Sequence, residues 1–131
     1  TATSSQGWLT LTGGSGTGDG SITAAAIANG SVTQRNASIT LTGGGAVQII
    51  NVTQDPAAPV FNINTSSLNY QNTGGIQNLS ITSNVAWNIV GVPIWANINP
   101  ISGNGNGAID VVATTNTFSG IRNATLTITG G

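Results

Sequence analysis

The sequence Ala-Thr-Leu-Thr-Ile-Thr, at residues 124–129, alternates apolar and polar side chains without a break. A period of two is typical of a β-strand with one buried and one exposed face. Similar alternation occurs in the ranges 76–82, 87–89 and 109–113, and Gly-rich stretches separate several of these segments. The sequence therefore predicts an all-β protein.

The chain contains a long internal repeat. Residues 8–44 align without a gap with residues 95–131 at an offset of 87, and 15 of the 37 aligned pairs are identical. Such self-similarity indicates tandem copies of one structural unit. Because the chain has 131 residues, it holds about one and a half units of 87 residues. The identical pairs include Trp8/Trp95, Gly16/Gly103, Gly18/Gly105, Gly20/Gly107, Arg35/Arg122 and Gly43/Gly130.

The repeat predicts two segments. Residues 1–55 are expected to form the C-terminal part of a first unit, and residues 56–131 a second unit that stops before its last strand. That strand is expected at residues 46–53 of the first unit, after a turn at Gly43-Gly44-Gly45, and it has no counterpart in the second. A unit of about seven short strands joined by Gly-rich turns is typical of a β-sandwich.

A series of short motifs resembles the BACON domain, an immunoglobulin-like module. In the second unit they are Leu68-Asn69-Tyr70, Gly74-Gly75, Ser83-Asn84 and Trp87, followed by Trp95, Ser102-Gly103, Asn116, Arg122 and a Thr-rich strand. The first unit adds the ending Ile50-Asn51-Val52-Thr53-Gln54. The resemblance implies an immunoglobulin-like β-sandwich, in about one and a half tandem copies, in a surface or secreted protein. It also implies carbohydrate binding, which was proposed for the family from its occurrence beside glycan-degrading modules.

The chain carries almost no charge. Two Arg and three Asp are its only charged side chains, and it has no Lys, Glu, His, Cys or Met. It therefore lacks the residues that usually build nucleophile–base pairs, paired carboxylates and transition-metal sites. We expect no enzyme activity, no metal site and no cofactor.

Composition also bears on partners and location. Two Arg offer no basic surface for nucleic acid, and no apolar run approaches the roughly 20 residues of a membrane span, so we expect neither nucleic-acid binding nor membrane insertion. A neutral surface of Thr, Asn and Gly is common in exported fibres and adhesins. The composition therefore favours an extracellular or cell-surface location.

Strand parity predicts which side chains of the second unit face its interior. They are the apolar residues that alternate with polar ones along each expected strand. The predicted core consists of Leu79, Ile81, Trp87, Ile89, Ile98, Ile109, Val111, Leu126 and Ile128.

Aromatic residues outside this core are candidates for recognition. Trp8 and Trp95 have the opposite parity to their apolar neighbours, so they are expected to face outward or lie at the rim of the sandwich. There each could cover its own core, contact a neighbouring domain or stack on a sugar ring. Tyr70 and Phe118 are further candidates for an interface or a carbohydrate site.

Two polar features have structural explanations. Arg35 and Arg122 occupy equivalent positions, and each is expected to hydrogen-bond loop carbonyls or an Asp. The Gly-rich loop at residues 13–20 lacks the Lys of a phosphate-binding loop and the carboxylates of a calcium site. A tight connection that needs positive φ explains its glycines better.

The stretch 46–52 departs from simple alternation. Val47 and Ile49 lie on one face of the expected strand, and Ile50 and Val52 on the other. A strand with two apolar faces can be covered on both sides, so these four residues are candidates for a strand that crosses between units.

These observations favour a structural function. The leading hypothesis is a subunit or repeat segment of an extracellular filament or surface fibre, in which copies associate end to end and complete one another's sandwiches. The alternative is a carbohydrate-binding module of a surface or secreted glycan-processing protein, with glycans as partners. A spacer within a larger surface enzyme is the third hypothesis.

Overall fold

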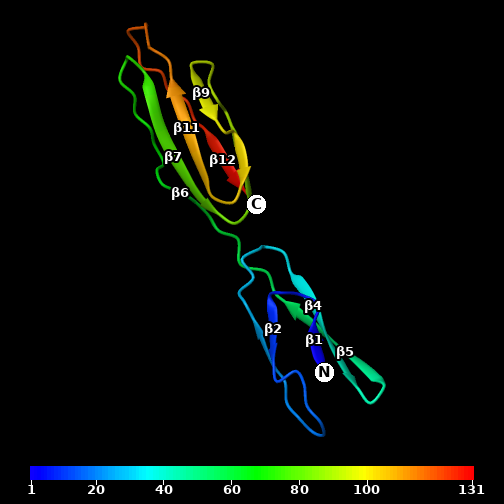
Figure 1. Cartoon of the computed structure of the whole chain (residues 1–131). Helices are drawn as coiled ribbons and strands as arrows, with labels where there is room; N and C mark the ends of the chain where they lie inside the picture. Colours follow the sequence, from blue (N-terminus) through cyan, green and yellow to red (C-terminus); the bar gives the residue numbers. More distant parts are fainter. The chain divides into compact units, whose positions relative to one another are not determined.

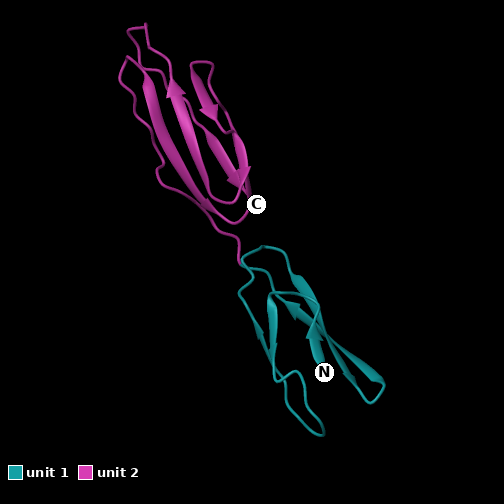
Figure 2. Cartoon of the chain, in the orientation of Figure 1, with its two compact units in different colours: residues 1–57 teal, residues 58–131 magenta.

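β-Strands are the only regular secondary structure of the chain. The computed structural model describes all 131 residues and divides into unit 1, residues 1–57, and unit 2, residues 58–131 (Figures 1 and 2). The predicted all-β class is thus confirmed. No part of the chain forms a helix that could span a membrane.

Unit 1 contains five strands in two sheets: β1 (Ala2–Ser4), β2 (Leu9–Thr12), β3 (Thr23–Ala26), β4 (Arg35–Gly43) and β5 (Ala46–Gln54). One sheet has the order β1-β4-β5, and β2 pairs with β3 in the other. A small core forms around the buried side chains of Leu9, Ala37 and Ile39. Gly44 and Gly45 both have positive φ and form the two-residue turn between β4 and β5, as hairpins of this kind require.

Unit 2 contains seven strands: β6 (Phe61–Ile63), β7 (Gly75–Ser83), β8 (Ala86–Val90), β9 (Ala96–Asn99), β10 (Ser102–Asn104), β11 (Gly107–Ala113) and β12 (Thr127–Gly130). They form a sheet of order β6-β7-β11-β9 and a sheet of order β10-β8-β12. Side chains from both sheets meet in one core, which makes unit 2 a β-sandwich.

The core of unit 2 contains the residues that strand parity selects. Seven of them are buried: Leu79, Ile81, Trp87, Ile89, Ile98, Ile109 and Val111. Leu126 and Ile128 are partly buried and pack against this cluster. Four further side chains that parity did not select also pack there, namely Phe61, Ile63, Leu68 and Tyr70.

The 87-residue repeat is visible in the strand pairing. Leu9 pairs with Ala26 in unit 1, and the equivalent residues Ala96 and Ala113 pair in unit 2. Ala2 pairs with Leu41, and Ile89 pairs with Ile128. Strands β1, β2, β3 and β4 therefore correspond to β8, β9, β11 and β12. Strand β5 has no counterpart in unit 2. Strands β6 and β7 have none in unit 1, where residues 15–17, equivalent to β10, form no strand.

Candidate functional site

A cleft opens into the core of unit 2. It has a volume of about 910 Å³ and lies between the segments 63–72 and 121–128. Leu79, Val111 and Ala113, which are buried, also line it. We call it the edge cleft. Its size falls within the range of about 300–1,000 Å³ that is common for ligand sites.

The edge cleft runs beside an unpaired strand edge. Strand β12 pairs with β8 on one side and is the last strand of its sheet. No residue of β8 or β10 lines the cleft, so the cleft lies along the other side of β12. Unpaired backbone N–H and C=O groups on a free strand edge are a template for another strand.

Unit 1 shows what occupies the corresponding edge. There β5 pairs with β4 along its whole length, from Arg35 opposite Gln54 to Gly43 opposite Ala46. Val52 lies opposite the buried Ala37 and packs against the core of unit 1. Ala37, Ile39 and Leu41 of β4 therefore have strand partners on β5. Their counterparts Ala124, Leu126 and Ile128 line the edge cleft instead.

Each unit contains an Arg stacked on a Trp. The guanidinium carbon of Arg35 lies 4.5 Å from the Trp8 ring centroid, and that of Arg122 lies 4.7 Å from the Trp95 ring centroid. Arg35 also donates to the carbonyl of Ile27 at 2.7 Å, and Arg122 to the equivalent carbonyl of Thr114 at 2.5 Å. The expected contact with loop carbonyls is present in both units.

The two Arg side chains differ in two partners, since only Arg35 also donates to the carbonyl of Ala28, at 3.2 Å, and to a Gln side chain. Nε of Arg35 donates to Oε1 of Gln54, the last residue of β5, at 2.8 Å. Gln54 in turn donates from Nε2 to the carbonyl of Ile27 at 2.9 Å, which closes a three-part hydrogen-bond network. Arg122 makes a single hydrogen bond, to Thr114. Unit 2 therefore has no counterpart of the contact between Arg35 and Gln54.

Comparison of the sequence with models of protein families finds a match to the BACON family, described as "Putative binding domain, N-terminal". The match covers residues 1–55 and 78–131. The chain belongs to the BACON family. This confirms the resemblance seen in the motifs and places both units in a family described as binding domains. The searches of curated proteins and of solved structures found no match.

Three of the four aromatic candidates line the edge cleft of this BACON chain. They are Tyr70, Trp95 and Phe118, and Asn side chains at 69, 72, 116 and 123 lie around them. Phe118 is 77% exposed. Trp8 is half-buried in unit 1, where it packs against the core, so it belongs to a different site. One face of each stacked Trp is covered by its Arg.

The four inter-unit strand candidates all lie on β5. Val47, Ile49 and Ile50 are 58%, 64% and 48% exposed, and Val52 is half-buried. Val47 and Ile49 lie opposite Thr42 and Thr40, on the face of the β4–β5 hairpin away from the core. No bulge interrupts the pairing, so both faces of β5 carry apolar side chains and one of them is uncovered within this chain.

Tyr70 is anchored on the cleft wall. Its hydroxyl donates to the carbonyl of Val111 at 2.6 Å. Burial raises the pKa of Tyr70 above its ordinary value of 10.0, and a hydrogen bond with the Gln77 backbone opposes this in part. The folded state thus favours the neutral phenol, which can donate.

The raised pKa of Tyr70 predicts how stability depends on alkaline pH. A raised acid pKa contributes stability that is fully present below the unfolded-state value of 10.0 and is lost as pH rises through the folded-state value. We expect the urea concentration at the unfolding midpoint of unit 2 to decrease as the pH rises above about 10. Urea titrations from pH 8 to 11.5 measure this, and Tyr70→Phe should show a shallower decline. An identical decline in both proteins would contradict the assignment.

Parts of this site could not be found from the sequence. The wall at residues 63–72 starts at Ile63, the last residue of the three-residue strand β6, and continues as irregular chain, so it has no periodic pattern. The stacking of Arg on Trp also has no local signal. Its only trace is that Trp8/Trp95 and Arg35/Arg122 recur together at the same offset.

Proposed function

We propose that this BACON chain is a structural repeat segment of an extracellular filament or surface fibre, in which neighbouring units complete each other's sandwiches. One observation carries the proposal. Unit 2 has a free strand edge and an open cleft at the place where unit 1 holds β5. A strand with the sequence pattern of β5, supplied by a neighbouring unit, is the occupant that fits both features.

The backbone and the core both favour such an occupant. A strand added to β12 would pair the free N–H and C=O groups, as in other cases of strand addition. In the register of unit 1, the residues that match Ile50 and Val52 would lie opposite Leu126 and Ala124. Burial of an apolar side chain of this size is worth about 1.5–3 kcal/mol, so two such residues provide a substantial driving force.

Arg122 supports the register of this strand. In unit 1, Gln54 at the end of β5 accepts a hydrogen bond from Arg35 and donates one to the carbonyl of Ile27. Arg35 donates to the same carbonyl. A Gln at the same position of the incoming strand would meet Arg122 and the carbonyl of Thr114. Hydrogen bonds to a charged group contribute about 1.5–3 kcal/mol, so the Gln helps to select one register over its neighbours.

Unit 1 offers a second free edge. Strand β3 pairs only with β2, and all four of its residues are exposed. In unit 2 the corresponding strand β11 is also paired with β7, and Ile109, Val111 and Ala113 are buried. Strand addition at either of these edges would join unlike surfaces head to tail, and such contacts propagate instead of closing. This favours a filament over a closed dimer.

The remaining parts of the proposal rest on composition. The near absence of charge and the Thr-, Asn- and Gly-rich surface favour an exported fibre over an intracellular protein. The three Asp are separated in sequence, and no group of three or more metal-ligating side chains is present. We therefore propose a non-catalytic role outside the cell or at its surface.

The test uses a peptide with the sequence of residues 45–54 as a stand-in for the neighbour's strand. A fluorescently labelled peptide is titrated with the full chain, and anisotropy reports binding. Arg122→Ala in the chain, or Ala in place of Gln54 in the peptide, should each weaken binding by roughly tenfold. The two changes together should weaken it little further, because they remove the same interaction. A scrambled peptide that binds equally well, or no binding at all, would overturn the proposal.

The second candidate function is carbohydrate binding, and a specific observation favours it. Tyr70, Trp95 and Phe118 lie with several Asn amides on the walls of one cleft. Aromatic faces and amide groups together are suited to the apolar faces and hydroxyls of sugars. Titration with a panel of soluble oligosaccharides, followed by NMR shifts of unit 2, separates the candidates. Saccharide binding that Phe118→Ala abolishes, with no response to the peptide, would favour this function instead.

A further inference from the structure

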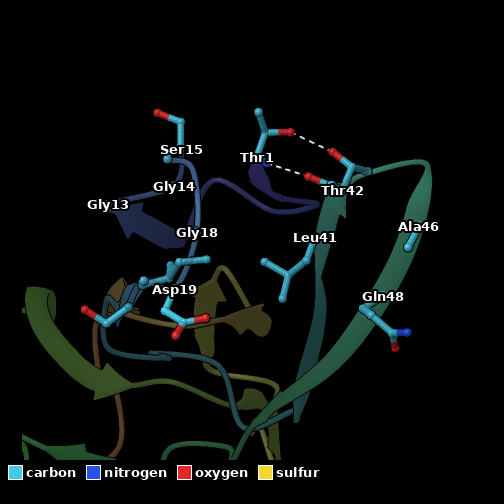
Figure 3. A pocket seen from close by; sticks show the side chains of 15 residues that line it. Thr1, Gly13, Gly14, Ser15, Gly18, Asp19, Leu41, Thr42, Ala46 and Gln48 are labelled. Atoms are coloured by element: carbon cyan, nitrogen blue, oxygen red, sulfur yellow. Dashed lines mark hydrogen bonds between the residues drawn. The ribbon is translucent and has the colours of Figure 1, made fainter.

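Unit 1 contains a separate cavity of about 330 Å³. The Gly-rich loop at residues 13–20 lies on one side, and Leu41, Ala46 and Gln48 of the β4–β5 hairpin lie on the other (Figure 3). Thr1 lies between them, and its N-terminal nitrogen donates to the carbonyl of Thr42 at 2.6 Å. We call this space the glycine cavity.

Unit 2 shows what fills the corresponding space. Gly103 and Gly130 lie directly opposite Trp87 on the two neighbouring strands. The indole N–H of Trp87 donates to the carbonyl of Gly105 at 2.9 Å. A Cβ at Gly107 would lie 2.5 Å from the Trp87 ring, and one at Gly103 would overlap the same ring. Trp87 is 4% exposed, so Gly103 and Gly107 form the seat of its indole, whereas a Cβ at Gly130 would overlap the ring of Phe61.

The counterparts of Gly103, Gly105, Gly107 and Gly130 line the glycine cavity of unit 1. By the offset of 87 they are Gly16, Gly18, Gly20 and Gly43. No atom lies within 4 Å of a Cβ built on any of them. Gly16, Gly20 and Gly43 do not have positive φ, so the backbone of unit 1 does not need glycine there.

The surroundings of the glycine cavity are correspondingly open. Ile22 is 38% exposed, whereas its counterpart Ile109 is fully buried at 0%. By the offset of 87, Gly18 corresponds to Gly105, whose carbonyl accepts the indole N–H in unit 2. In the repeat register Thr1 corresponds to Asn88, so the position of Trp87 corresponds to one residue ahead of Thr1 on the line of β1.

We infer that the glycine cavity is a seat for one tryptophan side chain, carried by an extended strand that continues the line of β1. The indole lies against Gly16 and Gly20, and its N–H donates to the carbonyl of Gly18. This inference rests on the proposed function, because it adds a second place where a neighbouring strand completes a unit. The glycine cavity of unit 1 shares no lining residue with the edge cleft of unit 2. It also explains why unit 1 retains glycines that its own backbone does not require.

The test places a tryptophan at this position in the full chain. The tripeptide Val-Ala-Trp is joined ahead of Thr1, and a matched protein carries Val-Ala-Ala. Thermal unfolding of unit 1 is followed through the NMR signals of Ile22 and Ile39. The tryptophan extension should raise the midpoint by at least about 5 °C over the alanine extension, and the Ile22 signals should shift with the ring current of the indole.

A blocked cavity provides the control. Gly16→Val places a side chain in open space, so unit 1 should fold normally while the gain from the tryptophan extension is lost. Equal midpoints for the tryptophan and alanine extensions would overturn the inference, as would a gain that persists in Gly16→Val. Binding of the peptide of residues 45–54 is tested through Arg122 of unit 2, whereas the tryptophan extension is tested through Ile22 and Ile39 of unit 1, so failure of one proposal is distinguishable from failure of the other.

Discussion

Replacement of Trp87 by alanine is expected to destabilise unit 2 by about 3–5 kcal/mol. The indole is 4% exposed and packs in the main core beside Ile89 and Leu79. The change also leaves the carbonyl of Gly105 without its donor. Urea unfolding followed through the isoleucine methyl signals of unit 2 measures the loss.

Phe118→Ala is the matched control for Trp87→Ala. Phe118 is an aromatic residue of the same unit but is 77% exposed, so its truncation should change the free energy of unfolding by no more than about 0.5 kcal/mol. A loss below about 1 kcal/mol for Trp87→Ala would mean that the strand parity used to place the core is inverted.

Gly103→Val is expected to destabilise unit 2 by about 1–3 kcal/mol or more, since the new side chain overlaps the Trp87 ring. Intrinsic strand propensity acts in the opposite direction, because Val is favoured over Gly in strands. The equivalent change Gly16→Val meets no atom within 4 Å in unit 1 and should cost less than about 0.5 kcal/mol. Urea titrations measure both variants, followed through isoleucine methyl signals of unit 2 for Gly103→Val and of unit 1 for Gly16→Val.

A double-mutant cycle identifies the cause of the Gly103 effect. If the clash with the indole is responsible, Gly103→Val should cost clearly less in a Trp87→Ala background than in the unchanged chain. Equal costs in the two backgrounds, or equal costs at residues 16 and 103, would show that the glycine is needed for some other reason.

The sequence predicted the elements of the fold that depend on local pattern. Alternation identified the strands that contain Ile109, Val111 and Ile128, and the offset of 87 identified which strands are equivalent. Alternation is a local pattern, and the offset comes from aligning the sequence with itself, so neither signal requires knowledge of tertiary packing. The finer expectation of an immunoglobulin-like topology stays a prediction.

The edge cleft could be anticipated only in outline. The repeat indicated that residues 46–53 have no counterpart in unit 2, but not where the cleft would lie. Its position depends on the irregular segment 64–72, which returns to the core through Leu68 and Tyr70 without strand periodicity. The glycine cavity was missed for a related reason. Positive φ accounts for Gly13 and Gly18 of that loop, whereas Gly16 and Gly20 make room for a side chain.

Hydrogen exchange at β12 tests the completion of one unit by another most directly. Residue-resolved exchange is measured on the full chain alone and with a saturating amount of the peptide of residues 45–54. The outward-facing amides of β12 should become protected by at least about tenfold, while the edge strand β9 of the other sheet is unchanged. Exchange at β12 that does not respond to the bound peptide would contradict the account.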